Sequence, residues 1–222
     1  MPLKREKANR ILQQLEILYP DTPIPLDHDS SFKLLIAVLL SAQTTDKKVN
    51  EVTPGLWAAY PTVAALAAAD PEDVRQIIRQ IGLAPTKSKN VVKLANQLLD
   101  HHQGQVPDNY EDLEALPGVG HKTASVVMSQ AFGEPAFPVD THIHRLAWRW
   151  GLSNGKSVVQ TEKDLKRIFP RDSWNQLHLR IIFFGREHCP ALHHDPEQCP
   201  ICNWAGVKSR LLAEQKKRKR RK

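Results

Sequence analysis

The chain has 222 residues, of which 41% are hydrophobic and 25% charged, a balance typical of folded globular proteins and not of bulk disorder. Its length allows one large domain or two small ones. No uninterrupted apolar run exceeds seven residues, as in residues 34–40, whereas a bilayer-spanning helix needs about 18 or more, which argues against a membrane protein. The N-terminal stretch lacks the apolar segment of a secretory signal, so we expect a reducing compartment.

The positive charge is concentrated at the C-terminus. The chain carries 31 Lys and Arg against 24 Asp and Glu, for a formal net charge of +7, and its last seven residues, 216–222, are all basic. The rest of the chain is therefore neutral. Because a run of like charges repels itself, residues 211–222 are predicted to form a disordered, solvated tail. Such a tail could bind phosphates without specificity, or act as a nuclear localisation signal in a eukaryote.

Apolar residues recur with helical spacing along most of the chain. The first predicted helix carries the stripe Ile11, Leu15, Ile17 and Leu18. In chain order, the predicted helical segments lie around residues 11–18, 32–40, 77–81, 91–99 and 121–128. Prolines separate these segments, and no convincing alternating strand is visible. The predicted fold class is all-α, with about ten helices and short connections.

Residues 113–128, LEALPGVGHKTASVVM, form the most informative stretch. One helix should end near Leu116, a turn should use Gly118 and Gly120, and a second helix should begin at once. Two glycines one residue apart permit positive φ and let a ligand approach the backbone closely. Free backbone amides beside the positive end of the second helix would suit a phosphate oxygen. The alternative is an ordinary connection between helices, because such turns also occur for purely steric reasons.

Two residues eighteen positions apart, Lys122 and Asp140, are candidates for catalytic residues. Lys122 falls in the first turn of the second helix, where the positive end of the helix dipole favours the neutral amine. Asp140, in the stretch FPVDTHIH, is placed near the N-cap of a further helix. A neutral amine and a carboxylate are the pair needed for imine chemistry at a sugar carbon. The simpler roles are a solvated charge for Lys122 and helix capping for Asp140.

These motifs resemble those of a known family. Residues 116–124, LPGVGHKTA, followed by residues 139–143, VDTHI, look like the helix–hairpin–helix signature of the endonuclease III family of DNA glycosylases and abasic-site lyases. Other stretches fit the same family in order: LLSAQTTD at 39–46, Gly82 and Leu83 with KSKN at 87–90, and FGR at 184–186. The resemblance extends from about residue 4 to about residue 205.

The resemblance implies a monomeric base excision repair enzyme that acts on duplex DNA with an oxidised pyrimidine or an abasic site, in the cytoplasm of a prokaryote or the nucleus of a eukaryote. Lys122 matches the family's nucleophile, which attacks C1′, displaces the base and forms a Schiff base before β-elimination cuts the strand. Asp140 matches the catalytic carboxylate. The implied fold has two helical lobes flanking a DNA-binding cleft. One lobe would span 24–134, and the other would combine 1–23 with 135–210.

The same resemblance assigns further residues to DNA binding. Gln43 matches the residue that fills the gap left by the extruded nucleotide, and Leu83 matches an apolar wedge between bases of the opposite strand. Without the resemblance, these would be a polar helix end and a core leucine. The hairpin and the second motif supply the other members of the set, which are Gly118, Val119, Gly120, His121 and His142.

The cysteines depart from the family pattern. Family members with a [4Fe–4S] cluster use four cysteines spaced Cys-x6-Cys-x2-Cys-x5-Cys, whereas this chain has Cys-x9-Cys-x2-Cys at 189, 199 and 202, with Lys208 at the fourth position. Iron–sulfur clusters and zinc both select thiolates, so Cys189, Cys199 and Cys202 favour a metal. Four interpretations stay open: a cluster with a fourth ligand of another type, a Cys3His zinc site, a metal-free loop packed through Trp204, or a disulfide formed during purification. The candidates for a fourth ligand are His188, His193, His194 and Asp195.

Two rival functions would use the same hairpin. A monofunctional glycosylase, such as the adenine-specific mismatch type, lacks the lysine nucleophile and usually carries a further recognition domain. A non-enzymatic binder would use the hairpin only for phosphates and would need neither Lys122 nor Asp140. The presence of Lys122 and the short length of the chain favour the bifunctional enzyme over the mismatch type.

Overall fold

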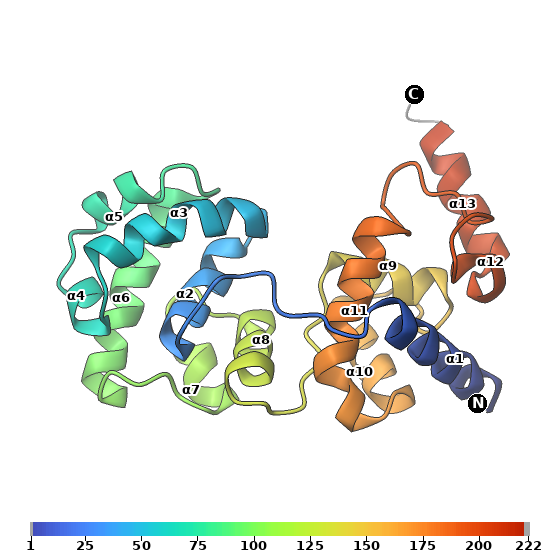
Figure 1. Cartoon of the computed structure of the whole chain (residues 1–222), viewed down its shortest axis with the longest axis horizontal. Coiled ribbons are helices and arrows are strands. Elements are labelled where there is room, and N and C mark those ends of the chain that lie inside the picture. The colour runs from blue at the N-terminus through green and yellow to red at the C-terminus, as the bar shows by residue number, and fades with distance from the viewer. Residues whose placement is uncertain (1, 220–222) are drawn as a thin grey trace. The chain divides into compact units, whose positions relative to one another are not determined.

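The computed structural model describes residues 2–219, and over this part of the chain every regular element is a helix (Figure 1). The predicted all-α class is confirmed. The helices outnumber the ten or so expected because several are very short, such as α4 (Val63–Ala67) and α12 (Cys202–Ala205). None of the described helices is long and apolar enough to cross a membrane. The chain divides into two compact units, one of residues 24–134 and the other of residues up to 23 together with those from 135 onward.

The 24–134 unit is a bundle of helices around a single apolar core. Its elements are α2 (Ser31–Ser41), α3 (Asp46–Ala59), α4, α5 (Pro71–Ile77), α6 (Ala84–His102), α7 (Tyr110–Ala115) and α8 (His121–Ala131).

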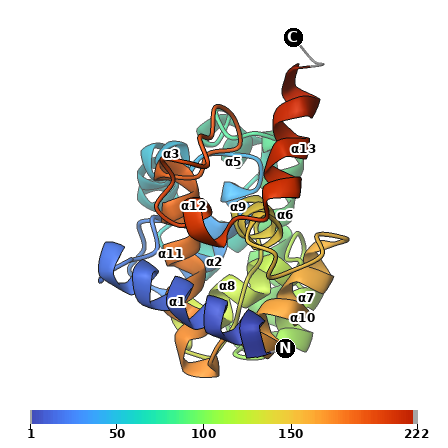
Figure 2. The same ribbon diagram turned by 90° about the vertical axis from the view of Figure 1, so that its right-hand side faces the viewer.

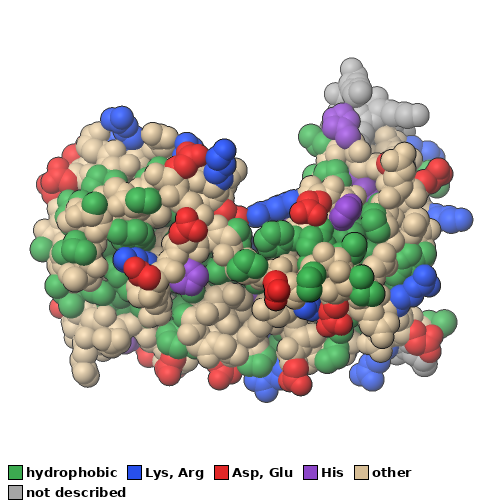
Figure 3. All heavy atoms as spheres, viewed as in Figure 1, with side chains coloured by type: hydrophobic (Ala, Val, Ile, Leu, Met, Phe, Trp, Pro, Cys, Tyr) green, Lys and Arg blue, Asp and Glu red, His purple; other side chains and the backbone are tan. Residues whose placement is uncertain are grey.

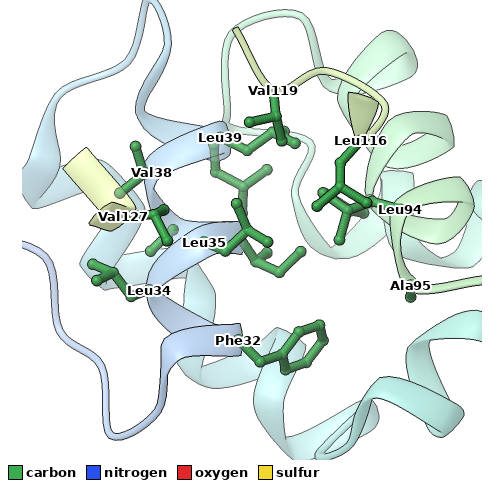
Figure 4. Packing of buried hydrophobic residues seen from close by; sticks show 14 of the residues in the cluster. Phe32, Leu34, Leu35, Val38, Leu39, Leu94, Ala95, Leu116, Val119 and Val127 are labelled. Atoms are coloured by element: carbon green, nitrogen blue, oxygen red, sulfur yellow. The ribbon is translucent and has the colours of Figure 1, made fainter. Parts of the chain in front are cut away.

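Helix α2 lies at the centre of this unit and contacts α3, α6 and α8. Phe32 and every residue from Leu34 to Leu40 are buried, because apolar side chains occupy all faces of this part of the helix instead of one stripe. Figure 4 shows Leu39 of α2 pointing toward Val119 in the turn between α7 and α8, with Leu116 near Leu94 of α6. The turn is thus packed directly onto the central helix.

Capping side chains set where most helices of this unit begin. In α2, α3, α4, α5 and α7, the residue before the helix accepts a hydrogen bond from a backbone N–H of the first turn, which the helix itself leaves unpaired. These caps are Ser30, Thr45, Thr62, Asp70 and Asn109. Among the helices of the unit, α6 and α8 have no capping side chain, and their N-cap positions are occupied by Leu83 and Gly120. Both N-cap residues belong to the segments to which the family resemblance assigns DNA binding.

The other unit joins the N-terminal helix to the C-terminal third of the chain. Its elements are α1 (Pro2–Leu18), α9 (Thr141–Arg149), α10 (Val158–Ile168), the 3₁₀ helix η1 (Arg171–Ser173), α11 (Trp174–Glu187), α12 and α13 (Lys208–Lys219). Helix α11 packs against α1 and α9 (Figures 1 and 2). The fully buried rings of Trp150 and Phe184 lie 5.8 Å apart at the centre of the core.

Two predictions about this unit need correction. The apolar stripe of α1 consists of Ala8, Ile11 and Leu15, whereas Ile17 and Leu18 near the end of the helix are exposed. Residues 211–219, expected to be disordered, continue helix α13, because Leu211 is buried and the Glu214 carboxylate pairs with Arg149 at 2.9 Å. Residues 220–222 of the predicted tail lie outside the described residues.

The charges on the surface are mixed in sign. In the view of Figure 3, Lys and Arg side chains alternate with Asp and Glu on the face shown of each unit, and no large patch of one sign is visible there. This agrees with a body whose positive and negative charges balance.

The cap of α7 provides a test of the local folding signals. Asn109 Oδ1 accepts a hydrogen bond from the Asp112 amide at 2.9 Å. Replacing Asn109 by alanine should lower the free energy of unfolding by about 1 kcal/mol in a urea titration, since the amide loses its partner. Asp108→Ala, at the exposed neighbouring position, is the control and should change stability much less. Equal losses in the two variants would contradict the capping argument.

Candidate functional site

The hairpin of the 24–134 unit consists of α7, the turn at residues 116–120 and α8. Gly118 has φ +81°, and a Cβ added there would lie 2.7 Å from Asn90 Nδ2 and 3.2 Å from Leu39 Cδ1. Only glycine fits this position, both for its backbone conformation and for the space. The Val119 amide closes the turn by donating to the Leu116 carbonyl at 3.1 Å.

Gly120 differs from Gly118 in both respects. Its φ is −100°, so the predicted positive φ is wrong for Gly120 although it is right for Gly118. A Cβ added at Gly120 would meet no atom within 4 Å. The protein itself therefore has no steric need for glycine here, and the open space beside this backbone can admit a ligand.

Side chains of the turn brace the hairpin. Val119 is buried in the core, so only its backbone can face a ligand. His121 is exposed, and its Nδ1 donates to the Glu114 carboxylate at 2.7 Å while its ring stacks on Tyr110 with centroids 5.6 Å apart. These contacts join α7, through Tyr110 at its start and Glu114 near its end, to the start of α8.

Lys122 lies in the first turn of α8, directly after the hairpin, and its side chain is exposed. The next residues turn into the core, where Ala124 and Val127 are fully buried. Packing of α8 thus fixes the backbone under Lys122 and leaves the amine in solvent.

Asp140 lies in the other unit, at the N-cap of α9. Its Oδ1 accepts from the Ile143 amide at 2.8 Å, and its Oδ2 accepts from His142 Nδ1 at 2.9 Å. The side chain remains 14% exposed. The capping role predicted for Asp140 is therefore real, and His142 orients the same carboxylate. The backbone at His142 packs closely on α11, since a Cβ added at Gly185 would lie 3.2 Å from His142 Cβ.

Gln43 and Leu83 lie on neighbouring loops of the 24–134 unit. Both are exposed, Leu83 by 54%, so Leu83 is not a core leucine. Both also have left-handed backbones, with φ +58° at Gln43 and +62° at Leu83, which is costly for residues with a side chain. The loops touch at Gly82, whose amide donates to Thr44 Oγ1 at 3.1 Å and whose added Cβ would lie 3.0 Å from the Gln43 carbonyl oxygen.

Sequence reasoning missed the residue that supports these loops. Lys87 of α6 is buried, and its ammonium donates to the carbonyls of Leu40, at 2.8 Å, and of Ala42. It also lies 3.4 Å from Thr44 Oγ1, the atom that accepts from Gly82. Burial lowers the pKa of Lys87, because the surroundings disfavour the charged form. The only sequence signal was its place in the stretch KSKN, where a lysine on a helix would usually be read as a solvated charge.

The three cysteines meet in the C-terminal part of the other unit. Cys189, Cys199, Cys202 and His194 are all buried, and one ligand atom from each lies within 4.8 Å of the others. The buried cluster fits a metal centre, with His194 rather than a fourth cysteine completing the set. All three cysteines are free, so the disulfide alternative has no support within the described residues.

The other candidates for the fourth ligand lie elsewhere. His193 is exposed with φ +57°, and His188 lies 3.8 Å from the Glu187 carboxylate. Asp195 is exposed and accepts from the Glu197 amide at 3.0 Å in a turn. Lys208, at the position of the family's fourth cysteine, is exposed at the start of α13. Of the four candidates for the fourth ligand, His194 is therefore the one that lies beside the thiols.

Two arginines of α9 tie this cluster to the helix that Asp140 caps. Arg149 is fully buried, and its Nη1 donates to Cys189 Sγ at 3.1 Å and to the Cys189 carbonyl at 3.2 Å. Arg145 Nη2 donates to the same carbonyl at 3.0 Å. Trp204, which follows Cys202, donates from its indole nitrogen to Gln14 of α1 at 3.0 Å. The loop therefore crosslinks α1 and α9.

Comparison with known proteins gives consistent relatives. The HhH-GPD superfamily base excision DNA repair protein family matches residues 36–171. Endonuclease III of Bacillus subtilis (strain 168) is 42% identical over 191 residues, which cover 86% of this chain and 87% of the relative. A trapped endonuclease III–DNA covalent intermediate is similar in structure with a TM-score of 0.88 and 41% identity, over 93% of this chain and 98% of that one. A non-covalent endonuclease III–DNA complex gives a TM-score of 0.89 at 41% identity, over 94% and 98%.

The role of Lys87 can be tested through stability. Lys87→Met keeps the apolar stem but leaves the buried Leu40 carbonyl and the partly buried Ala42 carbonyl without this donor, so the free energy of unfolding should fall by about 1–3 kcal/mol. Lys89→Met, at an exposed position of the same helix, should change it by less than about 0.5 kcal/mol. Urea titrations of the two variants make the comparison. Similar values for both would show that the buried ammonium does not support the loop.

Proposed function

The chain belongs to the endonuclease III family of the HhH-GPD superfamily, and we propose that it is a bifunctional DNA glycosylase and abasic-site lyase. It removes oxidised pyrimidines from duplex DNA and cuts the strand at the abasic site, acting as a monomer. One observation carries the proposal. Lys122 is exposed in the first turn of α8, directly after the hairpin, in a chain 41% identical to a protein solved as a covalent intermediate with DNA.

Lys122 is the nucleophile in this proposal. Its amine lone pair attacks C1′ of a deoxyribose whose base has left the stack, and the glycosidic bond breaks with its electrons going to the base, which takes up a proton. The nitrogen then loses a proton and its lone pair breaks the C1′–O4′ bond, while O4′ takes up a proton, so that the sugar ring opens to a protonated imine. The imine acidifies the C2′ proton, and loss of that proton breaks the C3′–O bond and expels the 3′ phosphate. Water then hydrolyses the imine and regenerates the amine.

Asp140 supplies the carboxylate that stabilises positive charge developing on the sugar and assists Lys122. The hydrogen bonds from the Ile143 amide and His142 fix the direction of this carboxylate before substrate binds. A charged group oriented in advance needs little rearrangement during the reaction. His142 is thus a positioning residue for Asp140.

The 24–134 unit provides the DNA contacts. The amides around Gly118 and Gly120 lie at the uncapped start of α8, where backbone N–H groups and the helix dipole favour a phosphate. Val119 and His121 contribute through this backbone and through bracing of the turn. Gln43 and Leu83, exposed on touching loops, fill the gap left by the flipped nucleotide and wedge the opposite strand.

The four buried residues Cys189, His194, Cys199 and Cys202 hold a structural metal centre. Three thiolates and an imidazole are a donor set for a soft or borderline metal. Bound metal would stabilise the folded loop and, through Arg145 and Arg149, the position of α9. The chemistry at the sugar remains with Lys122 and Asp140, which belong to other segments.

Borohydride trapping tests the lysine. Wild-type protein incubated with a duplex carrying thymine glycol, dihydrouracil or a bare abasic site should form a covalent protein–DNA adduct when the imine is reduced. Lys122→Gln and Lys122→Arg should form none, since neither side chain can make the imine. The arginine variant keeps the charge, so retained DNA binding would separate electrostatics from chemistry. Asp140→Asn keeps an oxygen for the Ile143 amide and should slow base release by about 10²–10⁴-fold.

Lys93→Gln, at an exposed position of α6, is the control and should trap like the wild type. Base release without any adduct would favour a monofunctional glycosylase. Tight binding to abasic DNA without base release or cleavage would favour a non-enzymatic binder. Either result would overturn the proposal.

Replacing the two hairpin glycines should affect different properties, namely stability for Gly118 and DNA binding for Gly120. Gly118→Ala should lower the free energy of unfolding by more than about 1 kcal/mol, because its backbone is left-handed and its Cβ would collide with Asn90. Gly120→Ala should change stability by less than about 1 kcal/mol. It should nevertheless weaken DNA binding about tenfold, the equivalent of roughly 1.4 kcal/mol, since a methyl group would displace a phosphate hydrogen bond. Unchanged binding in Gly120→Ala at fixed salt would contradict the assignment.

A further inference from the structure

The ligand residues of the metal centre have a compact spacing of their own. In sequence they read Cys-x4-His-x4-Cys-x2-Cys from Cys189 to Cys202, which differs from the family's four-cysteine pattern both in ligand type and in intervals. Short intervals of two to four residues are typical of structural zinc sites. The spacing is therefore compatible with four ligands that share a single metal ion.

The distances between ligand atoms are those of ligands that share one ion. Cys189 Sγ lies 3.6 Å from Cys202 Sγ and 3.4 Å from His194 Nε2. Around a tetrahedral zinc ion, with Zn–S of about 2.3 Å and Zn–N of about 2.0–2.1 Å, two sulfurs lie about 3.8 Å apart and a sulfur and a nitrogen about 3.5 Å. All pairs of the four atoms lie within 4.8 Å, so no ligand lies far from the group.

A four-iron cluster requires a different arrangement. Its four ligands each bind a separate iron, and the irons and their bridging sulfides fill the space between the ligand atoms. Four ligand atoms that all lie within 4.8 Å of one another leave no room between them for four irons and their bridging sulfides. The residues present therefore do not fit the [4Fe–4S] cluster that the family pattern implies.

The residues around the site provide positive charge and hydrogen-bond donors to three thiolates bound to a single divalent ion. Three thiolates and one divalent cation carry a net charge of −1, and the buried guanidinium of Arg149, which also pairs with the Glu214 carboxylate, lies 3.1 Å from Cys189 Sγ. The Cys202 amide also donates to Cys199 Sγ at 3.4 Å, within the Cys-x2-Cys turn. Such outer contacts orient thiolate ligands and stabilise their ionised form. Since all four ligands are buried, the site is closed, as in structural zinc centres.

From these observations we infer that the centre binds one tetrahedral zinc ion through Cys189, His194, Cys199 and Cys202, and is not an iron–sulfur cluster. The inference rests on the proposed metal centre but not on the proposed catalysis. The zinc would be structural and not redox-active, and it would stabilise the loop that contacts both α1 and α9.

Metal analysis of the full chain tests this directly. The protein is purified without oxygen from cells supplied with both iron and zinc, so that loss of an oxygen-sensitive cluster cannot mimic a zinc site. We expect one zinc per chain, no broad visible absorption, and X-ray absorption at the zinc edge showing three sulfurs and one nitrogen with no metal–metal scattering. About four irons per chain with a visible band, or no bound metal, would overturn the inference. Trapping assays on the same preparation report on the catalytic proposal independently.

Histidine variants identify the fourth ligand. His194→Ala should weaken zinc affinity at least tenfold in competition with a coloured chelator, because loss of a ligand should cost no less than loss of an outer contact. His194→Cys should retain one zinc with four sulfurs, even if the alanine variant does not fold. His193→Ala, at the adjacent exposed position, is the matched control and should bind zinc like the wild type. Equal zinc affinity in His194→Ala and His193→Ala would exclude His194 as a ligand.

Discussion

Burial of helix α2 on all its faces is the constraint on which the 24–134 unit depends. Its side chain at Leu39 meets Gly118 so closely that a Cβ there would lie 3.2 Å away, and this contact presses the hairpin turn onto the core. At its C-terminal end, the carbonyls of Leu40 and Ala42 accept from the buried ammonium of Lys87. One helix therefore positions both the turn that precedes Lys122 and the loop that carries Gln43. The hydrophobic effect supplies the stability, and a few polar contacts define the geometry.

In the other unit, the buried guanidinium of Arg149 has the corresponding role. It connects α9 with Cys189 of the cysteine cluster and with Glu214 of α13, so that three segments distant in sequence share one charged group. Asp140 caps the N-terminus of helix α9, so the position of Asp140 is coupled to the loop through backbone and side-chain contacts. A metal bound in that loop would stiffen the support of a residue proposed to act at the sugar, without touching the substrate.

Much of the fold and of the candidate site followed from the sequence, because it depended on local signals. Apolar periodicity gave the helical class, and the motif around Gly118 and Gly120 gave the hairpin. Asp140 was placed at a helix start by its neighbours. The sequence could not show that Lys87 is buried, since its acceptors are carbonyls 45 and 47 residues away in the chain. Nor could it select His194 from its neighbours, because the direction of a side chain in an irregular loop depends on tertiary packing.

The left-handed backbones at Gln43 and Leu83 restrict how these loops can vary during evolution. A β-branched side chain at either position would clash with its own backbone, so isoleucine or valine could not simply replace Leu83 although both are as apolar. Asparagine and glycine are the residues that tolerate this conformation best. Relatives that recognise other lesions would then be expected to exchange side chains here within a narrow set, or to rebuild the loop by insertion or deletion.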